Sequence, residues 1–240
     1  KQPLLPAEEV VEKIITDLED AKEYMSFESS ISLSDHENKD RRFRFNYHAI
    51  NALLARVYAY AGDAENALAC AKSVIDNCGL TLKNDNQNDP VLFSETICGL
   101  NMFEMDVNLS SAFSIGEKIN QQNFCNFTTL NSLFQITGTE SEDMRAKSAA
   151  FHRSNDEQKA ISRKYIDNDN EIIPLIRLPE MYYIMCEMSP LEDAATFINQ
   201  VRNKRGISAS MNETCSTEEE RFNALEREYR KEFYAEGQYF

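Results

Sequence analysis

The stretch FNYHAINALLARVYAYAGDAENALACAKSVIDNC, from Phe45 to Cys78, predicts two helices joined by a tight turn. In each half, apolar residues recur at three- and four-residue steps, which is the period of one helix face. These residues are Ile50, Leu53, Leu54, Val57, Tyr58 and Ala61, then Ala67, Leu68, Ala71, Val74 and Ile75. Between the halves, Gly62 suits a left-handed turn and Asp63 suits the cap of the second helix. We therefore expect a helical hairpin.

This hairpin matches the spacing of a tetratricopeptide repeat. The matching positions are Leu54, Ala55, Tyr58, Gly62 and Ala67. A single repeat of this type cannot bury its own apolar face, so it requires neighbouring helices. An apolar stripe from Val11 to Met25 predicts the first such neighbour, a helix over residues 7–25.

A second hairpin is predicted over residues 176–206. Its first helix has apolar residues at helical spacing, namely Leu178, Met181, Tyr182, Met185 and Met188. The following Ser189-Pro190-Leu191-Glu192 has the pattern of a capping box, with Ser189 as the N-cap of the next helix. We expect that helix to end at Gly206 and its last cations to interact with the helix dipole. Those cations are Arg202, Lys204 and Arg205.

A further helix is predicted near the end of the chain, capped by Thr217 with Glu220. It is expected to run to about Tyr234 or Ala235, where Gly237 ends it, and to pair Glu226 with Arg230. Its inward face is predicted to consist of Phe222, Leu225, Tyr229 and Phe233.

The segment between the hairpins lacks a clean period, apart from a possible strand at Val91–Ile97. The chain is therefore expected to be one mainly α domain of tetratricopeptide-like hairpins with an irregular, loop-rich insert. Residues 7–78 would form the first helix and first hairpin, residues 79–175 the insert, and residues 176–240 the second hairpin and final helix.

The composition of the chain excludes some classes of binding partner and some kinds of membrane contact. Forty acidic residues against 25 basic ones give a net charge of −15, which argues against a nucleic-acid partner. The longest strictly apolar run, Met181–Cys186, is far shorter than the roughly 20 residues of a membrane-spanning helix. The six cysteines include no C-x-x-C pair, so we expect mostly free, buried thiols, with one disulfide as the alternative.

Five passages in this order resemble the SusD/RagB family of outer-membrane nutrient-binding lipoproteins of Bacteroidetes. They are Glu8–Met25, Tyr47–Asp76, Ile173–Tyr182, Asn199–Gly206 and Glu226–Phe240. Together they cover a little over half of the chain, and their order is more specific than any one of them. Members of that family are usually about twice as long, so the resemblance implies that this chain is a fragment of such a protein.

The resemblance implies an α-superhelical SusD-like fold and a non-enzymatic role at the cell surface. A protein of this family is a surface-exposed outer-membrane lipoprotein, held by an N-terminal lipid anchor that this chain does not contain. It captures an oligo- or polysaccharide and passes it to a SusC-like TonB-dependent outer-membrane transporter. The helical hairpins would act as scaffold, and the irregular regions would carry the ligand site.

The insert contains the composition that a sugar site needs. Aromatic faces stack on sugar C–H groups, and planar amides hydrogen-bond to hydroxyls. Between Asn101 and Phe134, phenylalanines alternate with amides that include Asn120, Gln121 and Gln122. The candidate ligand contacts are Phe103, Phe113, Asn123, Phe124 and Phe127. The alternative is that the phenylalanines form a small core of the insert while the amides bond to loop backbone.

No cofactor, metal or catalytic site is indicated. His36, His48 and His152 lack metal-ligand spacing, and no Gly-x-Ser-x-Gly elbow is present. The acidic clusters at residues 85–89 and 167–171 lack the glycine and the bidentate glutamate of a calcium loop, so we expect solvated loops.

Two other functions stay open. The hairpins alone would suit a tetratricopeptide-type protein-interaction scaffold that binds a peptide in its groove. A polysaccharide hydrolase is the third possibility and the least favoured, because it needs two acids held across a cleft and no pair is singled out.

Overall fold

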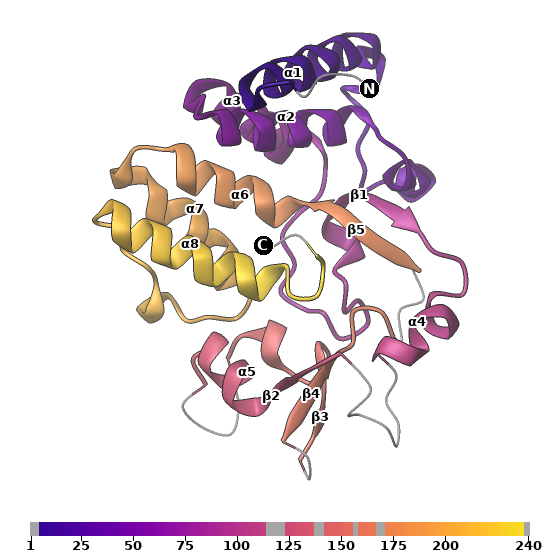
Figure 1. Ribbon diagram of the computed structural model, residues 1–240, viewed down its shortest axis with the longest axis vertical. Coiled ribbons are helices and arrows are strands. Elements are labelled where there is room, and N and C mark those ends of the chain that lie inside the picture. The colour runs from indigo at the N-terminus through magenta and orange to yellow at the C-terminus, as the bar shows by residue number, and fades with distance from the viewer. Residues whose placement is uncertain (1–4, 114–122, 137–141, 156–157, 167–170, 238–240) are drawn as a thin grey trace.

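The computed structural model describes residues 5–113, 123–136, 142–155, 158–166 and 171–237 (Figure 1). The α-helices are α1 (Ala7–Tyr24), α2 (Tyr47–Ala61), α3 (Ala64–Asn77), α4 (Met105–Phe113), α5 (Phe127–Leu133), α6 (Leu178–Met188), α7 (Leu191–Lys204) and α8 (Glu218–Glu232). The strands are β1 (Thr96–Asn101), β2 (Phe124–Asn126), β3 (Phe151–Ser154), β4 (Lys159–Ser162) and β5 (Ile172–Arg177). Short 3₁₀ helices include η2 (His36–Phe43), η3 (Phe93–Glu95) and η5 (Met144–Ala146). The fold is thus mainly α, as the sequence predicts.

The first hairpin forms as expected from α2 and α3. Gly62 adopts a left-handed conformation with φ of 78°, and the Asp63 carboxylate accepts a hydrogen bond from the Asn66 amide nitrogen at 3.1 Å. Small side chains at the helix contact are completely buried, namely Ala52, Ala55, Ala67 and Ala71. Because these side chains end at Cβ, the two helices can approach closely along their length.

The two hairpins pack directly on one another although about 100 residues separate them in the chain. Figure 1 shows α1, α2 and α3 as one layer above α6, α7 and α8, and α3 contacts α6. One continuous core includes Leu54 and Val74 of the first hairpin with Met181 and Ile198 of the second, all buried. Arg56 of α2 also donates a hydrogen bond to Glu180 of α6 at 2.7 Å. Each hairpin therefore covers the face that the other could not bury alone.

Three local expectations in the helical part are wrong. Ser189 ends α6, and the N-cap of α7 is Pro190, which has no side-chain acceptor for the first amides. Phe222 points outward and is 68% exposed, because only part of the predicted apolar face of α8 reaches the core. α8 ends at Glu232 and is followed by a turn in which Gly237 has a φ of 67°.

Other expectations for this part are confirmed. The Thr217 hydroxyl accepts from the Glu220 amide at 3.1 Å and caps α8. Glu226 and Arg230 form an ion pair at 3.7 Å, and Gly206 has a φ of 87° just beyond α7. All six cysteines are buried and free, and burial raises the pKa of the Cys78 thiol to about 11, so that thiol stays protonated and behaves as a small apolar group.

The described part of the insert forms two small antiparallel sheets. β1 pairs with β5, and β2, β4 and β3 form a three-stranded sheet in that order. The predicted strand at Val91–Ile97 is displaced, because η3 occupies its middle and β1 begins only at Thr96. Ile176, predicted to begin a helix, lies in β5, and α6 starts two residues later.

A buried ion-pair network joins the insert to the second hairpin. Arg205, completely buried, binds Glu95 of η3 at 2.7 Å and Glu232 of α8 at 2.9 Å. Arg145 of η5 binds Glu232 at 3.0 Å, and Arg202 binds Glu228 at 2.8 Å. The expectation that Arg202 and Arg205 serve only the helix dipole is therefore wrong, because both reach carboxylates of α8 that lie beneath the surface.

Candidate ligand-binding site

A cavity of about 430 Å³ lies where the insert meets the turn after α8. It is lined by Phe113 at the end of α4, by Asn123 and Phe124 at the start of β2, and by the turn residues Tyr234, Ala235 and Gly237. Its size falls within the range of about 300–1,000 Å³ that is typical of small-ligand pockets. Figure 1 shows the yellow turn beside the end of α8, above the three-stranded sheet in this view.

Three of the five candidate contacts line this cavity together, although α4 and β2 are separate elements. Phe113 and Asn123 flank a stretch, residues 114–122, that lies outside the described part of the chain, as do Asn120, Gln121 and Gln122. Phe124 is 37% exposed, so its ring is accessible to a ligand. Whether these residues bind a saccharide stays a prediction.

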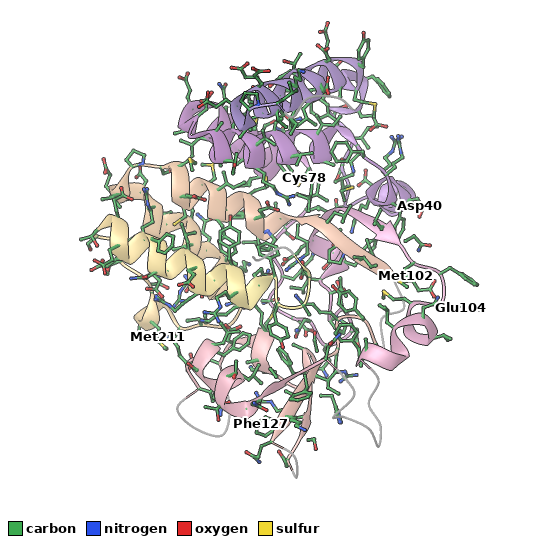
Figure 2. The ribbon with its side chains drawn as sticks, viewed as in Figure 1. Asp40, Cys78, Met102, Glu104, Phe127 and Met211 are labelled. Atoms are coloured by element: carbon green, nitrogen blue, oxygen red, sulfur yellow. The ribbon has the colours of Figure 1, made fainter. Side chains whose placement is uncertain are left out.

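Phe103 and Phe127 lie elsewhere. Phe103 is 73% exposed in the turn between β1 and α4. Phe127 starts α5 and packs on the small core of the insert, with the Arg153 guanidinium 5.5 Å from its ring centre. Figure 2 shows Met102 and Glu104, the neighbours of Phe103, well apart from Phe127. Phe127 thus matches the alternative of a small core.

The aromatic rings at the cavity are held by neighbours that do not line it. Phe113 packs on Tyr165 with ring centres 5.1 Å apart, and Tyr234 packs on Phe151 at 5.2 Å. The Lys159 ammonium lies 4.5 Å from the centre of the Phe124 ring. These contacts orient the rings before any ligand arrives, which lowers the entropy lost on binding.

The turn that forms one wall is fixed from behind. The Tyr165 hydroxyl donates to the Ala235 carbonyl at 2.7 Å. The Glu236 side chain is completely buried and accepts from Arg177 at 2.8 Å, and the Lys164 ammonium binds the same carboxylate. Sequence reasoning missed Tyr234, Ala235 and Gly237 as lining residues, since it placed this segment in or just after a helix.

Burial shifts the pKa values of ionisable groups in and behind this wall. It raises the pKa of the Tyr165 and Tyr234 hydroxyls above their usual value. The pKa of Lys164 is lowered mainly by burial, with Glu236 acting in the opposite direction. Both hydroxyls therefore remain protonated at pH 7, where Tyr165 donates to the Ala235 carbonyl and Tyr234 is hydrogen-bonded to Cys125.

A second cavity of about 330 Å³ lies between α6 and α8. It is lined by Glu187, Glu218, Arg221, Phe222, Leu225, Glu226 and Tyr229. Arg221 is already engaged there, because it pairs with Glu218 and donates to the Ser189 carbonyl at 2.8 Å. None of the predicted ligand contacts lies in this second cavity.

The acidic cluster at residues 85–89 serves the backbone. Asp89 accepts from the Phe93 and Ser94 amides at 2.7 and 3.0 Å, and Asp85 accepts from the Gln87 amide at 2.8 Å. In the other cluster, Asp167 and Asp169 lie outside the described residues. Within the part of the chain that is described, no group of three or more His, Cys, Asp or Glu side chains could hold a metal ion.

Comparisons with known proteins address the fold and the family. A comparison with curated proteins gives no significant match. Among solved structures, a SusD-like carbohydrate binding protein from Bacteroides vulgatus is 19% identical, with a TM-score of 0.65, over 98% of this chain and 51% of that one. Surface glycan-binding protein A from Bacteroides uniformis is 16% identical, with a TM-score of 0.67, over 97% and 57%.

A SusD-like protein from Bacteroides fragilis is also similar, with 16% identity and a TM-score of 0.69 over 98% of this chain and 60% of that one. The chain thus spans about half the length of these structures, and at such identities the likeness establishes the fold. The family model described as "SusD family" matches residues 76–240, which is more than half of the sequence. The chain belongs to the SusD family.

Proposed function

We propose that this chain binds a saccharide, without turning it over, in the cavity between α4, β2 and the turn after α8. The observation that carries the proposal is the meeting of Phe113, Asn123, Phe124 and Tyr234 at one cavity. Aromatic rings offer apolar faces to sugar C–H groups, and the Asn123 amide supplies partners for sugar hydroxyls. Membership of the SusD family supports it, as do two similar structures described as carbohydrate- or glycan-binding.

The lining favours a neutral saccharide. None of the six described lining residues has a charged side chain, and the net charge of −15 would repel an anionic ligand over a distance. The Lys159 ammonium close to Phe124 is packed on the ring face, where it orients the ring. We therefore infer that uncharged oligosaccharides bind more tightly than sulfated or carboxylated ones.

The setting inferred for this site is a nutrient-uptake complex at the cell surface. Family membership supports an outer-membrane lipoprotein that works with a SusC-like TonB-dependent transporter. No helix in the described part of the chain is long and apolar enough to span a bilayer. Copurification of such a transporter with the tagged natural protein would support this assignment, and its absence from gently solubilised outer membranes would contradict it.

The cavity is tested by Phe124→Ala in the natural protein. Loss of one stacking face is expected to weaken binding of a neutral oligosaccharide about tenfold, since such a contact contributes roughly 1–1.5 kcal/mol. Isothermal calorimetry with neutral hexasaccharides of glucose, mannose, galactose or xylose would measure the change. Phe103→Ala is the matched control, because Phe103 is exposed outside the cavity.

Two results would contradict the proposed binding role of this cavity. Equal affinities of wild type and Phe124→Ala would exclude the cavity as the site. Release of new reducing ends during incubation would show turnover and replace the binding role with a hydrolase.

One observation favours a second candidate, the protein-interaction scaffold. Phe222, which lines the α6–α8 cavity, is 68% exposed, and exposed aromatic residues are common anchors of protein interfaces. Crosslinking of a partner protein that is lost in Phe222→Ala but kept in Phe124→Ala would support it.

A further inference from the structure

The turn after α8 contributes Tyr234, Ala235 and Gly237 to the lining of the cavity. Within the described residues of this turn, the Glu236 amide donates to the Phe233 carbonyl at 3.0 Å. Ala235 has a φ of 63°, a conformation that costs an L-residue of order 1–2 kcal/mol. Such a turn needs outside contacts to hold a single shape.

Those contacts come from the strand end and loop behind the turn. Lys164 donates to the Glu232 carbonyl at 2.9 Å and also binds Glu236. Arg177, at the end of β5, reaches the Glu232 carbonyl at 2.6 Å and Glu236 at 2.8 Å. The Glu236 carboxylate is therefore neutralised by two cations beneath the cavity, where it does not face a ligand.

Tyr165 connects this turn to the opposite wall. Its hydroxyl donates to the Ala235 carbonyl at 2.7 Å, while its ring packs against Phe113 at 5.1 Å. Tyr165 is 6% exposed and is not among the residues that line the cavity. A shift of this one side chain would move both walls relative to one another.

We propose that Tyr165, Lys164 and Glu236 are positioning residues that set the distance between the two walls of the cavity. This rests on the proposed saccharide site. The affinity for a saccharide then depends on side chains that the ligand does not touch. A mobile wall would lose conformational entropy when a sugar binds, and that loss would weaken binding.

Tyr165→Phe is the decisive variant, since it removes the hydroxyl and keeps the ring on Phe113. Loss of one neutral hydrogen bond predicts about fivefold faster hydrogen exchange at the Glu236 amide, and a similar fall in affinity for the neutral hexasaccharides. The melting temperature should fall by no more than about 4 °C. Tyr60→Phe, at an exposed position of α2, is the matched control and should change none of these values.

Glu236→Gln provides a second measurement. It keeps the shape of the side chain but leaves Lys164 and Arg177 without their shared countercharge, so exchange at residues 234–237 should rise further than in Tyr165→Phe. If this variant unfolds, Tyr165→Phe still decides the matter.

Exchange is read without ligand, so the two proposals fail separately. Unchanged exchange in Tyr165→Phe overturns the positioning role, as does faster exchange with unchanged saccharide affinity. If the wild-type protein binds none of the saccharides, the proposed function fails, and the exchange rates alone decide whether these residues hold the turn.

Discussion

At the scale of single residues, the helix caps show how closely a local pattern determines local structure. The Thr217 cap forms as predicted, with Ser216 completing it through a hydrogen bond from its amide to Glu220 at 2.8 Å. At Ser189 the same kind of pattern fails. Its backbone instead ends α6, where its amide donates to the Met185 carbonyl at 3.1 Å. Ser189 is thus the C-cap of α6, and Pro190 takes the N-cap position of α7.

Thr217→Ala tests the confirmed cap. Removing the hydroxyl leaves the Glu220 amide without its acceptor and should lower the free energy of unfolding by about 1 kcal/mol. Thr217→Asn supplies another acceptor at the same place and should retain most of that stability. Urea denaturation monitored by circular dichroism distinguishes the two, and equal losses in both variants would contradict a capping role.

At the scale of elements, two glycines end helices in the same left-handed conformation but in different surroundings. A Cβ at Gly62 would meet nothing within 4 Å. A Cβ at Gly206 would lie 2.8 Å from the Glu142 carbonyl oxygen. The sequence predicts the turn at both positions, because left-handed backbone favours glycine. The sequence does not indicate that the insert packs against the end of the second hairpin at Gly206 and leaves the end of the first helix of the other hairpin, at Gly62, open.

The two substitutions should therefore differ. In Gly62→Ala, the only expected penalty is that alanine is strained in the left-handed conformation, which should lower the free energy of unfolding by about 1 kcal/mol. Gly206→Ala adds displacement of the Glu142 backbone and should cost about 2–3 kcal/mol. Thermal and urea unfolding of the pair measure the difference, and an equal loss would show that the contact with Glu142 yields without cost.

At the scale of the whole molecule, the buried ion pairs around Glu228 and Glu232 connect segments that are far apart in the chain. Burial raises the pKa of Glu228, but Arg145, Lys231 and Arg202 outweigh it and lower the pKa from 4.5 to about 2. The neighbouring cations likewise hold the pKa of Glu232 well below its ordinary value, despite burial. Both carboxylates are therefore charged in the folded protein throughout the physiological pH range.

This network predicts acid sensitivity. Because the pKa of Glu228 is lower in the folded than in the unfolded chain, its contribution is complete above about pH 4.5 and disappears as the pH falls toward 2. The contribution is on the order of 3 kcal/mol. Glu228→Gln should lower the stability at pH 7 and flatten its decline between pH 5 and 3, as measured by urea denaturation.

Glu226→Gln is the matched control on the same helix, because the Glu226 side chain is 38% exposed and pairs with Arg230 at 3.7 Å. It should keep the wild-type dependence on pH. An unchanged slope in Glu228→Gln would mean that the acid sensitivity comes from other carboxylates.

Part of the candidate site could be predicted from the sequence, and part is visible only in the structure. Phenylalanine and amide composition indicated Phe113, Asn123 and Phe124, but it equally indicated Phe103 and Phe127, which lie outside the cavity. Composition reports which side chains are available, whereas convergence depends on contacts between α4, β2 and the turn after α8. Tyr234 could not be found this way, because its distance from Phe124 in the chain is about half the sequence.

The sequence by itself determined the first helix, the helices of the two hairpins and α8, the left-handed turns at Gly62 and Gly206 and the family, since helical period and turn chemistry act over a few residues. Only the tertiary structure decided that the hairpins stack across the insert, that Arg202 and Arg205 are buried, and that one turn forms a cavity wall. Those features depend on partners far apart in the chain, such as Glu228 for Arg202, 26 residues away, Glu95 for Arg205, 110 residues away, and Glu180 for Arg56, 124 residues away. The residues that neighbour a charged side chain in the sequence do not show whether that side chain faces water or pairs with a distant carboxylate.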